Sequence, residues 1–132
     1  MKLKTILFVL GLTFLFTITA FSQNKPKHIG CWEITKLDIA FDSEETNKTE
    51  NEAKNTIICF FEDGTFTNQN SNKDIPVLKG FYSVSEDGKT FSQRRDVDAK
   101  EDDMLMDILL LNDKEFIVET EGIAKMTLRK IV

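Results

Sequence analysis

Few side chains in this sequence have the chemistry of a catalytic or metal centre, and their spacing does not assemble one. His28 is the single histidine, and neither a Gly-x-Ser-x-Gly motif nor a Cys/His nucleophile pair occurs. Paired carboxylates stand at Glu44 and Glu45 and again over residues 101–103, in polar segments where solvated surface is their expected role. We therefore predict a non-enzymatic protein with no catalytic residues, no metal site and no cofactor.

The charge balance argues against nucleic acid as a partner. The chain has 17 lysine and arginine residues against 22 aspartate and glutamate residues, a formal net charge of -5. Such a surface lacks the cations that release counterions from a phosphate backbone, and no glycine-rich phosphate loop occurs. With 132 residues, of which 41% are hydrophobic, one domain with one modest core is expected.

Residues 1–22 have the pattern of a secretory signal peptide. Two lysines precede an apolar run that reaches Ala20, and the small residues Ala20 and Ser22 then mark a cleavage site after Ser22. A retained membrane anchor is the alternative, but a span needs about 20 apolar residues, and this run is shorter and interrupted by Gly11. We predict a secreted or periplasmic protein whose mature domain covers residues 23–132 and has no membrane span.

Both cysteines, Cys31 and Cys59, lie in the part of the chain that is predicted to be exported, where disulfides persist. A bridge between them would close a loop of about 29 residues and add roughly 3–4 kcal/mol of stability in the chain-entropy model. Two separate buried thiols are the alternative, because the bridge requires a particular strand register. The sequence leaves both open.

After Gln23 the sequence consists of short apolar runs separated by turn residues, and no long stretch has helical periodicity. This pattern predicts an all-β domain. In the first run the apolar positions change parity near Thr35 and Lys36, which predicts a β-bulge there. We expect eight strands, over residues 31–41, 56–61, 65–69, 78–85, 89–94, 104–111, 115–120 and 124–131.

Two tight turns fix the register of their hairpins. If Gly64 takes the left-handed position of a three-residue turn, Phe60 lies opposite Phe66 and both point to the same face. A four-residue Glu-Asp-Gly-Lys turn then places Val84 opposite Phe91. Both hairpins would turn large apolar side chains toward one common interior.

Tight and long connections alternate along the chain. In an antiparallel meander, odd-numbered connections lie at one end and even-numbered ones at the other. The long polar connections therefore gather at one end, the loop-rich end or mouth, and the tight turns at the other, the tight end. Eight strands must close or expose their edges, so this pattern favours an antiparallel up-and-down barrel over a two-sheet sandwich. The long connections are residues 42–55, 70–77 and 95–103, and we expect the first to be a solvated loop.

Five motifs carry a resemblance to a known family: Gly30-x-Trp32, Phe60-x-x-Asp63-Gly64-Thr65-Phe66, Gly80-x-Tyr82-x-Val84, Asp87-Gly88-Lys89-Thr90-Phe91, and Met126-Thr127-Leu128-Arg129-Lys130. In this order and spacing they resemble the small exported bacterial lipocalin-like domain proteins, over nearly all of residues 29–132. The resemblance implies an up-and-down barrel with Trp32 near the tight end and the first long connection beside the mouth.

The resemblance also implies a cation over the indole ring of Trp32. In lipocalins an arginine near the last strand packs on this tryptophan, and Arg129 is the matching residue. However, the strand parity that turns Met126 and Leu128 inward turns Arg129 outward, so the sequence leaves this pairing open.

A mostly apolar set of side chains should face the barrel interior. We predict that they line a site for a small hydrophobic molecule at the mouth, and the acidic loops disfavour anionic ligands. The same set also describes a filled core; the protein would then be a protein-interaction module that uses its acidic loops. A hydrolase built on an interior carboxylate or Tyr82 is a third interpretation. The predicted lining residues are Trp32, Ile34, Phe60, Phe66, Tyr82, Val84, Phe91, Ile108 and Leu110.

Overall fold

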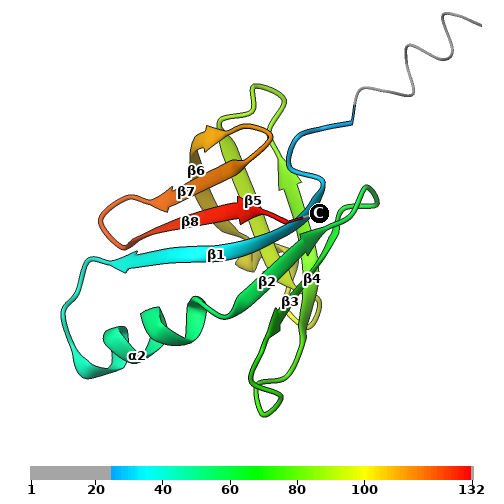
Figure 1. The fold of residues 1–132 in the computed structure, drawn as a ribbon. Helices are drawn as coiled ribbons and strands as arrows, with labels where there is room; N and C mark the ends of the chain where they lie inside the picture. Colours follow the sequence, from blue (N-terminus) through cyan, green and yellow to red (C-terminus); the bar gives the residue numbers. More distant parts are fainter. Residues whose placement is uncertain (1–24, 132) are drawn as a thin grey trace, which may run out of the picture.

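The computed structural model describes residues 25–131 and contains one closed antiparallel barrel (Figure 1). The predicted signal peptide at residues 1–22 lies outside the described residues. The strands follow each other around the barrel in chain order, and β8 closes it by pairing with β1. The elements are β1 (Gly30–Ile39), α2 (Glu44–Ala53), β2 (Thr56–Phe60), β3 (Thr65–Asn70), β4 (Leu78–Val84), β5 (Thr90–Arg95), a 3-10 helix (Lys100–Asp102), β6 (Met104–Leu111), β7 (Glu115–Thr120) and β8 (Ala124–Lys130).

The eight-stranded up-and-down barrel confirms the predicted fold class. Closure satisfies the backbone hydrogen bonds that the edges of an open sheet would leave exposed. The long connections and the β7–β8 turn lie at one end, and the turns after β2, β4 and β6 lie at the other. The two ends therefore differ as the alternation of connection lengths predicts.

The predicted β-bulge in β1 is confirmed. The pairing of β1 with β8 shifts register between Ile34 and Lys36, so that Leu37 and Ile39 lie partly buried beyond the shift. The strand ends at Ile39, two residues before the predicted end, and Phe41 is exposed. Ala40 still donates its backbone N–H to the backbone oxygen of Ile123 in the β7–β8 turn, and the chain then leaves the sheet toward α2.

The first long connection is not the loop that the sequence led us to expect, because it contains helix α2. Ser43 and Thr46 form a reciprocal capping box, and Glu44 and Glu45 in the first turn are stabilised by the helix dipole. No residue of α2 is buried, so the helix has no apolar face from which a hydrophobic pattern could be read.

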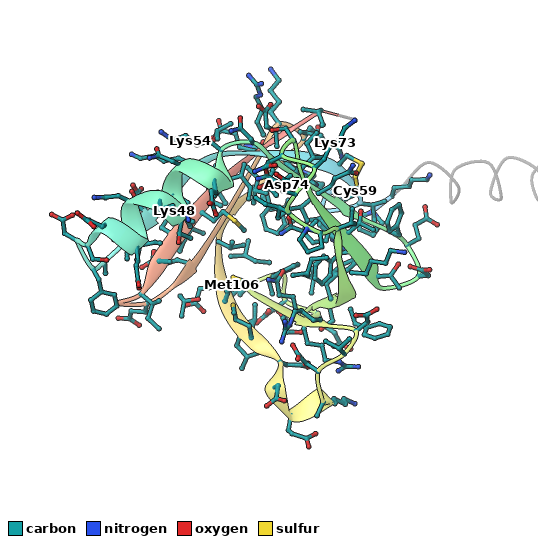
Figure 2. The ribbon with its side chains drawn as sticks, turned by 90° about the horizontal axis from the view of Figure 1, so that it is seen from below. Lys48, Lys54, Cys59, Lys73, Asp74 and Met106 are labelled. Carbon is teal, nitrogen blue, oxygen red and sulfur yellow. A yellow bond between two sulfur atoms is a disulfide. The ribbon has the colours of Figure 1, made fainter. Side chains whose placement is uncertain are left out.

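Helix α2 is attached to the barrel through polar contacts near its end. The backbone oxygen of Glu52 accepts hydrogen bonds from Thr56 Oγ1 at 3.4 Å and Asn70 Nδ2 at 2.7 Å. Ile39 donates its backbone N–H to Glu50 Oε1 at 3.0 Å. Figure 2 shows the helix, with Lys48 and Lys54, along one side of the barrel and Cys59 on the other side of the view.

The hairpin registers are as predicted. Phe60 pairs with Phe66 across the β2–β3 hairpin, and Val84 pairs with Phe91 across the β4–β5 hairpin. Gly64 has a φ of 85°, the left-handed conformation that the turn requires and that a side chain would strain. The tight turns therefore bring the aromatic side chains of three strands to one interior.

An aromatic cluster fills the half of the barrel nearest the tight end. Phe60 packs edge-to-face against Tyr82 and Phe91, with ring centroids 4.9 and 5.4 Å apart, and Phe116 packs in the same manner against Trp32 at 5.5 Å. These separations lie in the favourable range for aromatic pairs. The interior at this end is therefore a packed core.

Gly80 on β4 allows this packing, because an added Cβ would overlap the backbone carbonyl of Arg94 and lie 2.7 Å from the ring of Phe66. We expect Gly80→Ala to lower the free energy of unfolding by about 1–3 kcal/mol or more, as overpacking does. Urea unfolding measures this change. Lys79→Ala, on the exposed face of the same strand, is the matched control and should have little effect. An unchanged stability of Gly80→Ala would contradict the close packing of β4 on β5.

Cys31 and Cys59 are joined by a disulfide, which decides between the two states that the sequence left open. The two residues face each other directly across β1 and β2. Their side chains lie on the outer wall, because the neighbouring Trp32, Ile58 and Phe60 point inward. The described residues contain no free cysteine.

Candidate functional site

The predicted lining residues do not surround one open cavity. Most of them belong to the filled core, and Val84 and Ile108 are partly buried against it. Phe66 is the member of this set that also lines a cleft at the mouth. The buried members of the predicted set are Trp32, Ile34, Phe60, Phe66, Tyr82 and Phe91.

The prediction that Leu110 lines the interior is wrong, because this residue is 39% exposed. The pairing of β6 with β7 shifts register between Ile108 and Leu110. This irregularity interrupts the alternation, so Leu111 packs against the core in place of Leu110. Inward positions of β6 therefore cannot be counted at a constant spacing of two.

The predicted set left out five buried core residues: Ile58, Met106, Phe116, Val118 and Leu128. Each has the inward parity of its own predicted strand, and this signal was sufficient to find them. Phe116 is fully enclosed and contacts Phe60, Phe91 and Trp32. It therefore links the two sides of the aromatic cluster.

A cleft of about 240 Å³ lies at the mouth, between the ends of β3 to β6. Its apolar wall contains Phe66, Leu78 and Met104, and the amides of Asn68 and Gln93 stand beside them. Asn68 and Gln93 follow Phe66 and Phe91 at strand spacing, so they face the same interior one step closer to the mouth. The remaining lining residues are charged: Arg94, Arg95, Asp98 and Asp102.

The charged residues of the cleft are largely paired. Arg95 binds Asp98 through two hydrogen bonds of 2.9 Å, and the hydrogen bond from Arg95 lowers the pKa of the Asp98 carboxyl. Arg94 Nη1 lies 3.2 Å from Asp103 Oδ1. Asp102 takes part in no ion pair among residues 25–131. The cleft therefore combines an apolar wall, two amides and one carboxylate without a cationic partner.

No family model and no curated protein sequence matches this chain. Solved structures do match it. A lipocalin-like protein from Bacteroides uniformis superposes with a TM-score of 0.58 at 18% sequence identity, over 80% of this chain and 100% of its own. The chain has a lipocalin-like fold. This confirms, at the level of the fold, the resemblance drawn from the sequence motifs.

Two further structures share the fold of this chain. An uncharacterized protein from Bacteroides eggerthii matches with a TM-score of 0.58 at 15% identity, covering 78% of this chain and 98% of its own. A DUF4847 family protein from Bacteroides vulgatus matches with a TM-score of 0.52 at 13% identity, covering 78% of this chain and 93% of its own. At such identities the likeness establishes the fold, and function has to be argued from the site.

The cation over Trp32 in this lipocalin-like barrel is Lys130, and the match to Arg129 is wrong. Lys130 Nζ lies 5.2 Å from the centroid of the Trp32 ring, whereas Arg129 Nη2 binds Glu33 Oε2 at 2.8 Å on the outer wall. Strand alternation is the reason, because Leu128 points inward and residue 129 must then point outward.

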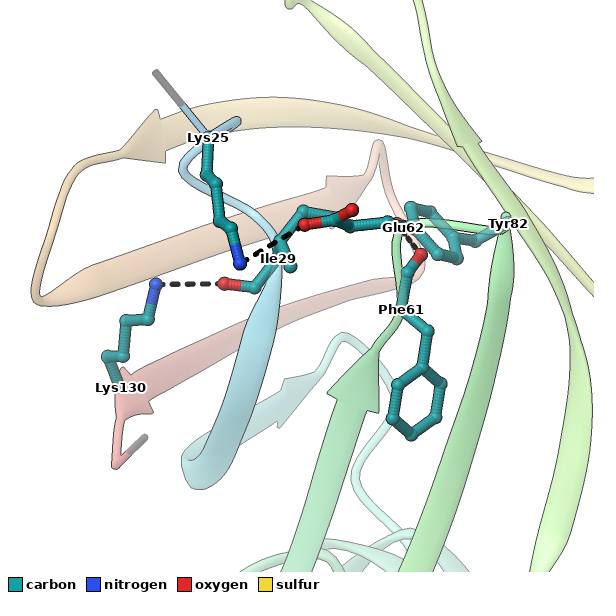
Figure 3. A network of polar contacts seen from close by, with 6 residues as sticks. All are labelled: Lys25, Ile29, Phe61, Glu62, Tyr82 and Lys130. Carbon is teal, nitrogen blue, oxygen red and sulfur yellow. Dashed lines mark hydrogen bonds and ion pairs between the residues drawn. The ribbon is translucent and has the colours of Figure 1, made fainter. Parts of the chain in front are cut away.

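The segment before β1 closes the tight end (Figure 3). Lys130 Nζ donates to the backbone oxygen of Ile29 at 2.9 Å, and Trp32 Nε1 donates to that of His28 at 3.0 Å. Lys25 pairs with Glu62 of the β2–β3 turn at 3.3 Å. These contacts hold the N-terminal segment against the core and close the tight end. In the described structure, the mouth is therefore the end that a ligand can reach.

Tyr82 lies under this segment, and its hydroxyl donates to the backbone oxygen of Phe61 at 2.6 Å. Burial, together with the nearby Asp63 and Glu62, raises the pKa of Tyr82. The ring of His28 packs edge-on against Tyr82 at 5.4 Å, and burial and the charge of Lys130 lower the pKa of His28. Both groups are therefore neutral near pH 7 and serve to close the barrel.

A second cleft of about 220 Å³ lies between the end of β1 and the β7–β8 turn. It is more open to solvent than the first cleft, and Ile39, Gly122 and Ile123 are among its lining residues. It encloses less of any ligand, so the cleft beside Phe66 is the better candidate site.

Residues 25–131 contain no group of three or more histidine, cysteine, aspartate or glutamate side chains that could hold a metal ion. None of their helices has the length and apolar character needed to cross a membrane.

Proposed function

We propose that this protein is an exported, non-enzymatic lipocalin-like barrel that binds one small molecule with an apolar body in the cleft at its mouth. The observation that carries this proposal is the cleft itself, in which Phe66, Leu78 and Met104 form an apolar wall beside the amides of Asn68 and Gln93. Binding sites for small molecules have this composition of apolar surface with a few polar groups that orient the ligand.

The size of the cleft limits the ligand. Its volume of about 240 Å³ is below the roughly 300–1,000 Å³ that is typical of pockets for drug-sized ligands. The aromatic cluster prevents deeper entry, because Phe60, Phe91 and Phe116 are almost fully buried behind it. A molecule with one ring or a short chain matches this space, whereas a long fatty acid does not.

The state of the titratable groups supports a binding role over a catalytic one. The Tyr82 hydroxyl donates to a backbone oxygen under the closed tight end, at the opposite end of the barrel from the cleft. At the mouth, Asp98 and Asp103 are each paired with an arginine. A general acid or base needs a proton that is free to move to a substrate; these three groups are already engaged, and among the described residues Asp102 is the one aspartate lining the cleft that is not.

The disulfide supports export. Disulfides persist in oxidising compartments such as the periplasm and the extracellular space, and Cys31 and Cys59 are joined. Together with the signal-peptide pattern of residues 1–22, this supports a ligand that the protein meets outside the cytoplasm.

The proposal predicts that Met104→Trp, which fills the cleft, weakens ligand binding about tenfold or more, equivalent to roughly 1.4 kcal/mol. The protein is purified from its own host and examined by native mass spectrometry, followed by organic extraction of the bound molecule. Leu105→Trp is the matched control, because Leu105 is 64% exposed on the outer face of the same strand. Wild type and Leu105→Trp should retain a stoichiometric small molecule.

Two results would contradict the proposal. One is equal retention of the small molecule by all three proteins, which would place the ligand outside the cleft. The other is the absence of a small molecule from the wild type, which would favour the protein-interaction module that the filled core also permits.

A further inference from the structure

We propose that the cleft at the mouth selects a protonated amine attached to a small apolar body; this inference rests on the proposed function of the same cleft. It follows from which charged side chains of the cleft are already paired. Two arginines and two aspartates line it. Each arginine is paired with an aspartate, one lining the cleft and one beside it, and Asp102 is left over.

Arg95 is not available to bind an anion. Both of its hydrogen bonds to Asp98 are 2.9 Å long, in the parallel geometry that makes arginine–carboxylate pairs strong. The same hydrogen bonding lowers the pKa of Asp98, which favours the ionised carboxylate that the pair requires. A carboxylate ligand would have to displace Asp98.

Arg94 is occupied on two sides. Its guanidinium carbon lies 4.9 Å from the ring centroid of Phe81, and Nη1 lies 3.2 Å from Asp103 Oδ1. Phe81 lies on the outer face of β4, next to Tyr82, which points inward. These contacts draw the charge of Arg94 toward the outer wall and Asp103, so this residue does not attract an anion into the cleft.

The polar groups that remain are acceptors for a cation. Asp102 has a carboxylate without a cationic partner among the described residues, and Asn68 and Gln93, which line the same cleft, each have an amide oxygen that can accept a hydrogen bond. A protonated amine has three N–H donors and a positive charge, whereas an alcohol has one donor and no charge. A carboxylate ligand would be repelled by Asp102.

The apolar wall accommodates the rest of the molecule. Phe66 is buried at the base of the cleft, Leu78 is partly buried, and Met104 covers the side that faces solvent. A thioether next to an aromatic ring is favourable. A phenyl group on a short linker therefore fits a cleft of about 240 Å³ that has both an apolar wall and polar groups.

The test compares 2-phenylethylamine, 2-phenylethanol and phenylacetate, three ligands that share one ring and differ in charge. Dissociation constants are measured at pH 7 and low salt by amide chemical-shift titration of the purified protein. The amine should bind at least about fivefold more tightly than the alcohol, and phenylacetate most weakly. In Asp102→Asn the amine and the alcohol should bind within about twofold of each other.

Glu101→Gln is the matched control. It also removes one negative charge, at the neighbouring position in the chain, but the Glu101 side chain does not line the cleft. The inference is overturned if Asp102→Asn keeps the preference for the amine, or if Glu101→Gln loses it equally. If the alcohol binds as tightly as the amine and Met104→Trp blocks both, the amine inference fails and the proposed function stands. If none of the three ligands binds, the amine inference fails, and the retention experiment with the host-purified protein decides the proposed function. If Met104→Trp has no effect on a ligand that binds, the ligand lies outside the cleft and both fail.

Discussion

Trp32→Ala is expected to lower the free energy of unfolding by about 3–5 kcal/mol, the range for truncating a large buried aromatic residue. The Trp32 side chain has no exposed surface. Its ring packs against Phe116 on one side and carries the ammonium group of Lys130 on another. Its Nε1 donates to His28, so the substitution also releases the segment that closes the tight end.

Urea-induced unfolding followed by far-ultraviolet circular dichroism measures this loss without relying on the fluorescence of the deleted residue. Leu105→Ala removes an apolar side chain that is already 64% exposed, and it should change stability by no more than about 0.5 kcal/mol. A loss below about 1 kcal/mol for Trp32→Ala would mean that the tight end is not packed around this residue.

Replacing both cysteines by serine, in Cys31→Ser/Cys59→Ser, is expected to lower the free energy of unfolding by about 3–4 kcal/mol. The disulfide joins residues 28 positions apart and so restricts the unfolded chain. In a domain of this size the core supplies only a small net stability, which makes such a loss a large fraction of the total. The serines would lie on the outer wall, where hydroxyl groups remain solvated.

A reductant provides the control for this second prediction. Dithiothreitol should shift the urea midpoint of the wild type toward that of the double variant and should leave the double variant unchanged. Equal midpoints for the oxidised wild type and the double variant would show that the bridge adds no stability beyond the strand pairing of β1 with β2.

The filled core restricts where ligand binding can occur. Aromatic rings occupy the tight half of the barrel, and the segment around His28 and Ile29 closes that end. The interior surface that remains lies at the mouth. Along the strands toward the mouth, the inward side chains are no longer aromatic but carry amide or charged groups. Function in this fold is therefore expected to depend on a few residues near the strand ends, and the core residues determine stability.

Local features of the fold could be predicted because their causes are local. The parity change near Thr35 and Lys36 requires a bulge whatever its partner strand, and the left-handed preference of Gly64 fixes the pairing of Phe60 with Phe66. The alternation of connection lengths places the tight turns at one end in any closed meander. These predictions need no knowledge of distant contacts.

The sequence could not predict helix α2 from hydrophobic periodicity, because none of its residues is buried. Only the Ser43 capping position and the acidic first turn marked its start. The prediction that Leu110 points inward was wrong because the irregularity in β6 appears only once that strand is paired with β7. A run of leucines at residues 109–111 has no internal signal that says which one faces the core.

By itself, the sequence determined the strand count, the hairpin registers and the difference between the two ends, since backbone preferences and alternating hydrophobicity act over a few residues. Tertiary structure alone decided that Cys31 meets Cys59, that Lys130 and not Arg129 covers Trp32, and that Asp102 lacks an ion-pair partner within the described chain. The physical reason for the first two is that these contacts join residues far apart in sequence. Their distances are set only when the barrel closes and every strand register is fixed at once.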